Sequence, residues 1–369
     1  MKMFQEEHLY SIALRASPLI GDVNFMKLIQ ITGSAKEVWH LSKKILKQID
    51  GIGTKISSSI GDEKFLNFAE KELEFCQKNN IQIKLRHQKE LPKLLSDCDD
   101  APAILYQKGN YDDTLTPISI VGTRNITSYG KNFIEEFLEI LKDKKVIVVS
   151  GLALGADGCA HAEALKNKIP TVGVLAHGLH IIYPSQHKKM AEEIIQKKGA
   201  LITEFNSTQK PDREHFLQRN RIVAGLSPVT IVVETAYGGG SINTVTSANS
   251  YNREVYALPG RINDKYSQGC NLIIAQNKAK ILSSFNDILD DLQLNQNSSK
   301  TGNLFTYKEI NISKEHRPIY NCIVENQPIS LDDLSAKLDI PAFKLLPILL
   351  DFELKSYIKA LSGKQFMTI

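Results

Sequence analysis

The amino-acid sequence predicts an α/β protein built around a doubly wound, mostly parallel β-sheet. Between residues 117 and about 290, short apolar runs rich in β-branched residues alternate with segments of helical periodicity. Strands of a parallel sheet are covered by helices on both faces, so they form continuous apolar runs rather than alternating patterns. The runs that fit this description cover residues 118–121, 146–149, 171–175, 201–203, 229–233 and 255–258.

A small helical domain is predicted before the sheet, over residues 1–70. Its apolar residues recur at helical spacing and are interrupted by Pro18, Gly21 and Gly33. The Ile-Asp-Gly-Ile-Gly-Thr-Lys segment at 49–55 is similar to the hairpin of a helix-hairpin-helix, which presents backbone N–H groups to a DNA phosphate. A plain turn between two helices of a small SAM-like bundle is the alternative interpretation.

Three further segments follow the helical domain. We expect an extended α/β domain over residues 71–290, a polar and aperiodic linker over 291–310, and a compact, mainly helical unit over 311–369. The last residues, 364–369, alternate between apolar and polar, which is typical of a half-buried strand.

The bulk composition narrows the class of protein. The chain has 369 residues and a net charge of +4, which permits a polyanionic partner without demanding one. Its five cysteines are scattered without CxxC spacing, which argues against a disulfide scaffold or zinc ribbon and fits a reducing compartment. The N-terminus carries acids where a signal peptide needs an apolar run, and no stretch reaches roughly 20 apolar residues. We therefore expect a cytoplasmic protein with no membrane span and no metal or other cofactor.

Glycines and small hydroxyl residues follow three of the predicted strands. Glycine allows a close backbone approach to an anion, and the helix after each loop offers unpaired N–H groups. Because the carboxyl ends of parallel strands share one edge, these loops predict a metal-free phosphate site there. Its members are Gly122, Thr123, Arg124 and Asn125 after the first strand, Ser150 and Gly151 after the second, and Gly239, Gly240 and Ser241 after the fifth.

The first loop does not fit the common nucleotide-binding fingerprints. Arg124 occupies a place where the GxGxxG pattern needs glycine, and lysines stand about 20 positions on, where a dinucleotide fold needs an acid. No GxxxxGK[ST] sequence occurs, so a P-loop is also excluded. An arginine at such a turn is suited to forked hydrogen bonds with a phosphate. Lys131, in the helix that follows, adds a second cation to this predicted site.

A second basic element lies between the fourth and fifth strands. If it is helical, Arg219 and Arg221 point away from each other. One of them then faces the crevice while the other forms an internal ion pair, with Glu204 or Glu234 as its partner. An aromatic residue in this element either stacks on a base or packs into the core. The element adds Arg219, Asn220 and Arg221 as predicted phosphate contacts and Phe216 as a candidate base-stacking residue.

Candidate catalytic and metal-binding groups are better explained as structural residues. Cys159 and His161 are two apart and point to different faces of a helix, and His177 and His180 have no carboxylate nearby in the sequence. Asp157 is expected to cap or brace the loop beside a helix start. We therefore predict a binding protein rather than an enzyme.

Taken together, these motifs resemble the DNA-processing protein A (DprA/Smf) family of bacteria. The resemblance implies a Rossmann-like domain that binds and protects single-stranded DNA and forms a homodimer. It also implies that the protein helps to load RecA during natural transformation (competence) and recombination. The sequence departs from the family pattern at Leu217, where proline is usual, and at Gly239, where serine is usual. The matching segments are residues 91–95 and 101–110 (a strand-like lead-in), 121–124, 129–130, 150–157, 160–161, 182–184, 204–205, 219–226, 240–241 and 258–260.

The C-terminal unit resembles the winged helix of the same family. Residues 331–335 would be its first helix, Pro341 to Leu354 its second, and 355–366 its wing. DNA affinity depends heavily on cationic contacts, yet residues 312–369 are electrically balanced. We therefore expect this unit to bind protein rather than DNA. The seven basic residues are Lys314, Arg317, Lys337, Lys344, Lys355, Lys359 and Lys364, and the seven acidic ones are Glu315, Glu325, Asp332, Asp333, Asp339, Asp351 and Glu353.

Two alternatives to a single-strand binder remain. The segment 237–244 is similar to the PGGxGTxxE motif of Rossmann-like nucleotide phosphoribohydrolases, but it lacks the proline, and Ser247 stands where the glutamate belongs. The second alternative is that the crevice binds a small nucleotide that regulates the protein. Release of free base from a nucleoside monophosphate would favour the first alternative, and calorimetry with mononucleotides would favour the second.

Overall fold

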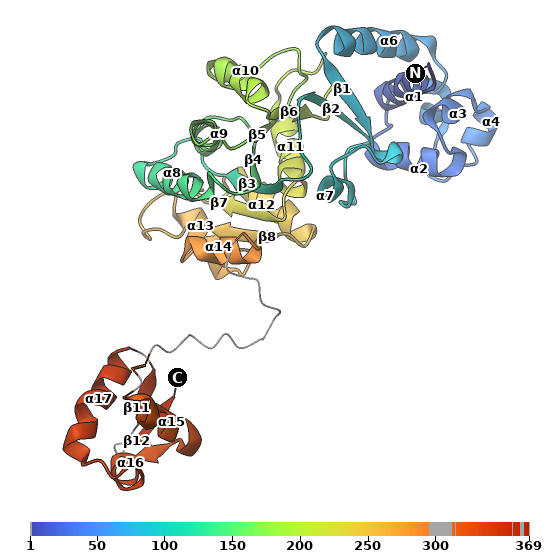
Figure 1. Ribbon diagram of the computed structural model, residues 1–369. Coiled ribbons are helices and arrows are strands. Elements are labelled where there is room, and N and C mark those ends of the chain that lie inside the picture. The colour runs from blue at the N-terminus through green and yellow to red at the C-terminus, as the bar shows by residue number, and fades with distance from the viewer. Residues whose placement is uncertain (1, 295–311, 314, 356, 362–364, 369) are drawn as a thin grey trace. The chain divides into compact units, whose positions relative to one another are not determined.

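The structure, a computed structural model, describes residues 2–294, 312–313, 315–355, 357–361 and 365–368. The chain divides into two compact units, Met1–Ser298 (unit 1) and Ser299–Ile369 (unit 2), shown in Figure 1. Each unit has its own β-sheet and its own hydrophobic core. Most of the predicted linker, 295–310, lies outside the described residues.

Unit 1 is organised around a nine-stranded sheet in the order β1-β2-β6-β5-β4-β3-β7-β8-β9. The seven strands from β6 to β9 in this order run parallel to one another, whereas β2 pairs antiparallel with β6 and β1 pairs antiparallel with β2 at one edge. The predicted α/β fold and all six predicted strands are confirmed. The strands are β1 (Ile81–Leu85), β2 (Ile104–Gly109), β3 (Thr116–Val121), β4 (Val146–Ser150), β5 (Thr171–Val174), β6 (Ala200–Thr203), β7 (Val229–Val232), β8 (Glu254–Ala257) and β9 (Lys280–Ile281).

Helices cover both faces of this sheet, as a doubly wound fold requires. In β4, Val146 and Val148 belong to the core beneath α8, α9 and α14, while Ile147 and Val149 belong to the core beneath α11, α12 and α13. This alternation buries both faces and explains why the strand is apolar throughout. The helices are α8 (Ser128–Leu141), α9 (Ala156–Lys166), α10 (Lys188–Gln196), α11 (Arg213–Gly225), α12 (Ser241–Ser250), α13 (Gln268–Ala275) and α14 (Phe285–Asp291).

The N-terminal helices pack beside β1 and β2 around a separate core that includes Phe25, Leu28 and Ile104 (Figure 1). Helix α6 continues through residue 70, where we placed a domain boundary, and that boundary remains a prediction. The helices are α1 (Lys2–Ala16), α2 (Asp22–Thr32), α3 (Ala35–His40), α4 (Lys43–Leu46), α5 (Thr54–Ser59) and α6 (Glu63–Lys78).

The lead-in to the sheet differs in part from the prediction. Residues 104–109 form β2 as expected, but the segment 91–95 is not a strand. It contains the start of α7 (Lys93–Ser96), which begins directly after Pro92. Proline is favoured where a helix starts, because its fixed φ suits the first turn and its missing N–H costs nothing there.

In its described residues, unit 2 packs three helices on a small sheet in the order β10-β12-β11. The helices predicted over 331–335 and 341–354 are present, and a further described helix, α15, precedes them. Its core includes Ile323, Leu334, Leu349 and Phe352. The elements are α15 (Arg317–Asn326), β10 (Ile329–Ser330), α16 (Leu331–Leu338), α17 (Ala342–Leu354), β11 (Ile358–Leu361) and β12 (Gln365–Thr368). Within the described parts of both units, no helix combines the length and the apolar character that crossing a membrane requires.

Candidate nucleic-acid interface

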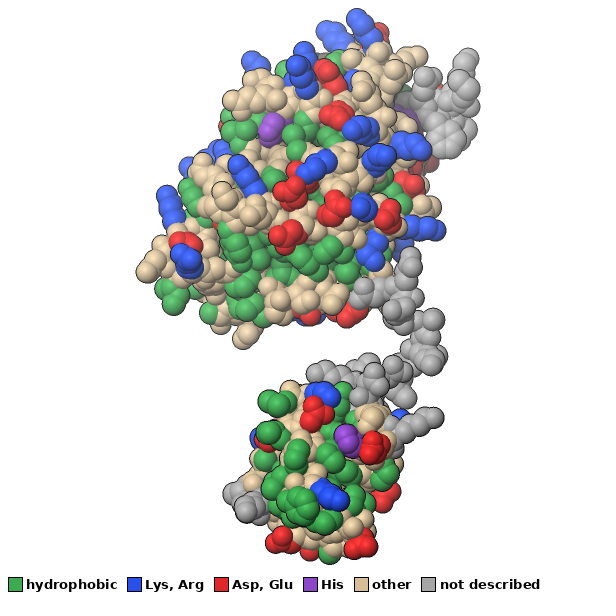
Figure 2. All heavy atoms as spheres, turned by 60° about the vertical axis from the view of Figure 1, so that its left-hand side comes forward, with side chains coloured by type: hydrophobic (Ala, Val, Ile, Leu, Met, Phe, Trp, Pro, Cys, Tyr) green, Lys and Arg blue, Asp and Glu red, His purple; other side chains and the backbone are tan. Residues whose placement is uncertain are grey.

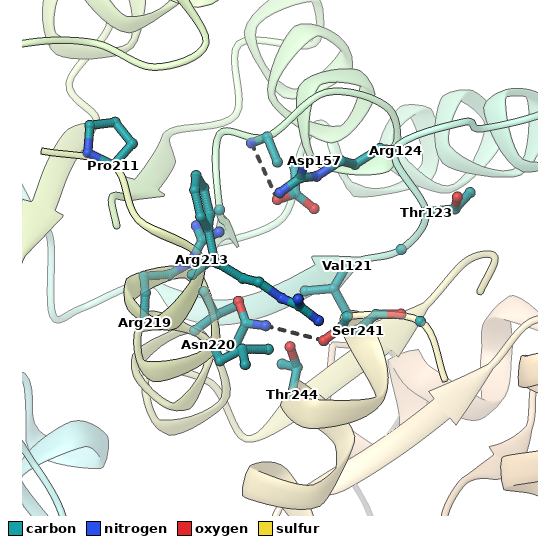
Figure 3. A pocket seen from close by; sticks show the side chains of 18 of the residues that line it. Val121, Thr123, Arg124, Asp157, Pro211, Arg213, Arg219, Asn220, Ser241 and Thr244 are labelled. Atoms are coloured by element: carbon teal, nitrogen blue, oxygen red, sulfur yellow. Dashed lines mark hydrogen bonds between the residues drawn. The ribbon is translucent and has the colours of Figure 1, made fainter. Parts of the chain in front are cut away.

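A cavity of about 1050 Å³, here called the cleft, lies at the carboxyl ends of β3, β4 and β7. These strands are parallel neighbours in the sheet, so the loops that follow them converge at one edge, as the sequence predicted. The starts of α11 and α12 complete its wall (Figure 3). The predicted site residues that line it are Gly122, Thr123, Arg124, Gly151, Phe216, Arg219, Asn220, Gly239, Gly240 and Ser241.

Glu234 holds the first loop in place. Its backbone oxygen accepts a hydrogen bond from Thr123 N at 2.6 Å, and its carboxylate accepts from Thr127 N at 2.8 Å and Thr127 Oγ1 at 2.5 Å. A carboxylate at this position satisfies free N–H groups at the start of α8 and is favoured by the helix dipole. The loop leaves Arg124 exposed beside the cleft. From the sequence, Glu234 was a candidate partner for an arginine, and the structure corrects this role.

Arg219 forms part of the cleft wall beside the second loop. Its side chain is buried, donates a hydrogen bond to Val174 O, and leaves Nε without a partner among the described residues. Burial lowers the pKa of the Arg219 guanidinium, and the Asp157 carboxylate opposes that shift. A Cβ at Gly151 would lie only 2.0 Å from Arg219 Nη1, so glycine is needed to make room for this arginine rather than for an anion.

The third loop offers backbone that is open to a ligand. A Cβ at Gly240 would have no atom within 4 Å, and the same holds for Gly238, whose φ of +65° favours glycine. Ser241 begins α12, and its buried Oγ has no hydrogen-bond partner among the described residues. Asn220 reaches across from α11 and donates to Gly240 O at 3.2 Å (Figure 3). This part of the cleft combines the start of a helix with an unsatisfied hydroxyl, as an anion site does.

Two predicted phosphate contacts lie outside the cleft. The hydroxyl of the fully buried Ser150 donates a hydrogen bond to Ile120 O at 2.6 Å, so this side chain bonds to a neighbouring strand of the sheet. Arg221 pairs with Glu204 at 2.5 Å and Asp22 at 3.4 Å, with only 12% of its side chain exposed. Residues two apart on a helix point in nearly opposite directions, so only Arg219 faces the cleft. The internal pairing with Glu204 is the alternative that the sequence left open.

Asn125 and Lys131 line a neighbouring recess of about 510 Å³ instead. Arg124 belongs to both cavities and therefore links the recess to the cleft. Asn125 donates to the Tyr266 hydroxyl at 3.0 Å, and His187 also lines the recess. The two predicted residues are thus close to the site but outside its main cavity.

Aromatic side chains meet beside the arginines. The guanidinium carbon of Arg124 lies over the Phe216 ring, 5.2 Å from its centre, and that of Arg219 lies 6.0 Å away. The Tyr183 ring centre is 5.9 Å from that of Phe216. Tyr183 also lines the cleft, and the sequence analysis assigned it no role beyond membership of the motif at 182–184. No periodicity marks it, because it lies in a loop.

His161 and Asp157, two groups considered as catalytic candidates, form hydrogen bonds inside the fold. The buried His161 shares a 2.7 Å hydrogen bond with Thr171 Oγ1, and burial lowers its pKa to about 3. Asp157 Oδ2 accepts from Ala153 N at 3.3 Å, so it braces the loop before α9 (Figure 3). Among the described residues, no three His, Cys, Asp or Glu side chains are grouped so that they could hold a metal.

Comparisons with known proteins agree with this architecture. The model of the family "DNA recombination-mediator protein A" matches residues 82–293, and that of the "DprA winged helix domain" matches 309–364. The Smf protein of Synechocystis is 32% identical over 296 residues, covering 79% of this chain and 74% of that protein. DNA processing protein DprA of Bacillus subtilis is 40% identical over 208 residues, covering 55% of this chain and 69% of that protein.

Solved structures of two related proteins share the fold. The X-ray structure of DNA processing protein A from Streptococcus pneumoniae superposes with a TM-score of 0.66 at 28% identity, covering 77% of this chain and 97% of that one. The protein from Helicobacter pylori, whose structure addresses its single-stranded DNA binding mode, gives 0.52 at 28% identity, covering 58% and 96%. The chain therefore belongs to the DNA recombination-mediator protein A (DprA/Smf) family.

Proposed function

We propose that this protein binds single-stranded DNA by its backbone phosphates, in the cleft of unit 1. The observation that carries the proposal is the convergence of Arg124, Arg219 and the open backbone of Gly240 on one cavity. Guanidinium groups and free N–H groups are the donors that phosphate oxygens accept from. The Helicobacter pylori relative, with a similar fold and a described single-stranded DNA binding mode, supports the same assignment.

The cleft favours binding over hydrolysis. Its two carboxylate-bearing lining residues, Asp157 and Asp212, both have structural roles. Asp157 accepts from Ala153 N, and Asp212 accepts from Glu214 N at 2.9 Å as the N-cap of α11. Ser247, at the place of the phosphoribohydrolase glutamate, supplies no acid or base. The role we propose is therefore a non-enzymatic one.

The proposal extends to the family's wider role. We expect the protein to form a homodimer and to help load RecA onto the bound strand during transformation and recombination. A RecA nucleation assay on DNA coated with single-strand-binding protein tests this part. Faster filament formation in the presence of this protein is the expected result, and an unchanged lag would contradict it.

We assign unit 2 to protein contacts. Figure 2 shows apolar side chains gathered on the visible face of this unit. In α17, exposed apolar residues recur at spacings of three and four, which places them along one side of the helix. Such a stripe resembles a protein-binding surface more than a phosphate-binding one. The stripe consists of Phe343 (70% exposed), Leu346 (48%), Leu350 (57%) and Leu354 (78%).

The direct test is the affinity of an Arg124→Ala variant for labelled oligonucleotides of unrelated sequence. Loss of one charged phosphate contact should weaken binding by roughly 10- to 100-fold for every sequence. It should also reduce the slope of log affinity against log salt by about 0.7. Lys145→Ala is the matched control, because this exposed lysine lies just before β4, at the opposite edge of the sheet. Equal affinities of the Arg124→Ala variant and the unaltered protein would refute the assigned site.

A further inference from the structure

The segment between β6 and α11, residues 204–212 and here called the β6–α11 loop, brings cations to the cleft. Lys210 lies in this loop, and Arg213 is the first residue of α11. Both residues are exposed and both line the cleft, where Figure 3 labels Arg213. Cations in such a place attract a polyanion. The position of this loop therefore bears directly on the proposed binding of DNA.

The N-terminal helices hold the middle of the loop. Glu72 of α6 is 2% exposed, and its carboxylate accepts hydrogen bonds from Ser207 N at 2.9 Å and from the Ser207 hydroxyl. Burial raises the pKa of the Glu72 carboxyl, and the two hydrogen bonds from Ser207 oppose that shift. A buried acceptor is costly to leave without its donors, so this contact constrains where Ser207 lies.

A second link joins the N-terminal helices to the start of the loop. Nη2 of Arg221, in α11, lies 3.4 Å from Asp22 Oδ2 of α2 and 2.5 Å from Glu204 Oε2. Glu204 is the first residue of the loop, directly after β6. The N-terminal helices therefore contact the loop at Ser207 and contact the helix that follows it through Arg221.

The stretch between Ser207 and Lys210 is a closed turn rather than a free tether. Thr208 N and Oγ1 donate to Asn206 Oδ1 at 3.1 and 2.7 Å, and Gln209 Oε1 accepts from Asn206 N at 3.2 Å. Gln209 O also accepts a 3.0 Å hydrogen bond from the loop after β5. A turn tied in this way passes a displacement of Ser207 on to Lys210. The same bonds limit its size, so we expect a shifted loop rather than an unfolded one.

We infer that Glu72 is a positioning residue for DNA binding, which holds the β6–α11 loop so that Lys210 and Arg213 stay in the cleft wall. The inference rests on the proposed function and gives the N-terminal helices a part in it. None of the described residues of these helices lines the cleft, so they brace it without touching the strand. Supporting contacts of this kind set how precisely a site is held.

The test measures the affinity of full-length variants for a labelled oligothymidine over a range of salt concentrations. Glu72→Ala should weaken binding roughly three- to tenfold and lower the slope of log affinity against log salt by about 0.7, the equivalent of one phosphate contact. Glu72→Gln keeps an oxygen for Ser207 N and should bind nearly as well as the unaltered protein. Glu7→Ala is the matched control, because it removes a buried carboxylate that bonds to Ala35 N and not to the loop. Trp39 fluorescence checks that the N-terminal helices remain folded, and an equal loss of affinity in folded Glu7→Ala would overturn the inference.

A double-mutant cycle separates positioning from a general loss of structure. In a Lys210→Ala/Arg213→Ala background, Glu72→Ala should cause almost no further loss of affinity, because the side chains that it positions are gone. Ser207→Ala, which removes only the hydroxyl, is the milder variant and should show a smaller loss with the same dependence on the two cations. If the losses add, or if Glu72→Ala binds as tightly as the unaltered protein, the inference is wrong while the proposed function stands. If the unaltered protein does not bind the oligothymidine, the proposed function itself fails.

Discussion

Replacing Gly151 by alanine should reveal how tightly Arg219 is fitted into the cleft wall. The new Cβ would lie 2.0 Å from Nη1, 2.4 Å from Cζ and 2.5 Å from Nη2 of Arg219. Ordinary contacts begin near 3.4 Å, so the guanidinium must move by more than 1 Å. It would then lose its hydrogen bond to Val174 O and its proximity to the Asp157 carboxylate.

The expected cost follows from those two losses. A hydrogen bond from a charged donor contributes about 1.5–3 kcal/mol, and a weaker attraction between the Arg219 guanidinium and the Asp157 carboxylate adds to that cost. Partial relaxation of the loop lowers the sum, so we expect about 3 kcal/mol of destabilisation. For a unit of this size, that corresponds to a fall in Tm of roughly 6–12 °C. Trp39, the single tryptophan of the chain, lies in unit 1 and reports its unfolding by fluorescence.

A matched glycine and a double-mutant cycle make the reasoning refutable. Gly240→Ala places a Cβ in open space at φ −60°, so its Tm should be unchanged or slightly higher. In an Arg219→Ala background, Gly151→Ala should add almost no further cost, because the clashing group is gone. Additive effects of the two substitutions would show that the clash with Arg219 is not the cause.

Three further outcomes are expected. Burial lowers the pKa of His161 from 6.5 to about 3. Between these two pH values the unfolded chain binds a proton at this residue and the folded chain does not. Stability should therefore fall as pH decreases from 6.5 toward 3, and urea titrations should show a weaker fall for a folded His161→Gln variant. Glu234→Gln should lower the free energy of unfolding by about 1–2 kcal/mol, because Thr127 N and Oγ1 lose a charged acceptor. An unchanged Tm in calorimetry would contradict the capping role. Leu350→Glu should leave DNA affinity and the Tm of unit 2 unchanged but slow RecA filament formation, and an unchanged filament lag would remove α17 from the protein-contact assignment.

The sequence predicted the sheet well because its signal is local. Each of β3 to β8 is a short run whose residues are buried on both faces, so composition alone marks it. Their order and parallel direction brought the glycine loops to one edge, and most of the predicted site residues line one cavity there. The edge strands β1 and β9 were not predicted, since one is only half-buried and the other has two residues.

The roles of single side chains were harder to predict because they depend on partners far along the chain. Arg221 is held by Asp22, which lies in the N-terminal helices, and Thr123 is held by Glu234. No local sequence pattern indicates a contact between residues that lie so far apart in the chain. The choice between Arg219 and Arg221 as the cleft-facing residue was therefore open until the structure placed Glu204 beside the second of them.

The glycine loops show why a motif predicts a location better than a contact. Gly151 and Gly240 belong to similar loops after parallel strands, and both were assigned to phosphate binding for the same reason. In the structure, the space beside Gly151 is filled by Arg219, whereas the space beside Gly240 is empty. A glycine can thus admit either a ligand or a buried side chain, and only the side chain packed from another element decides between them. At Gly151 the absent Cβ positions a cation for the ligand, and at Gly240 it exposes the backbone itself. The proposed phosphate site therefore depends on both kinds of glycine, although only the second kind is expected to touch the strand.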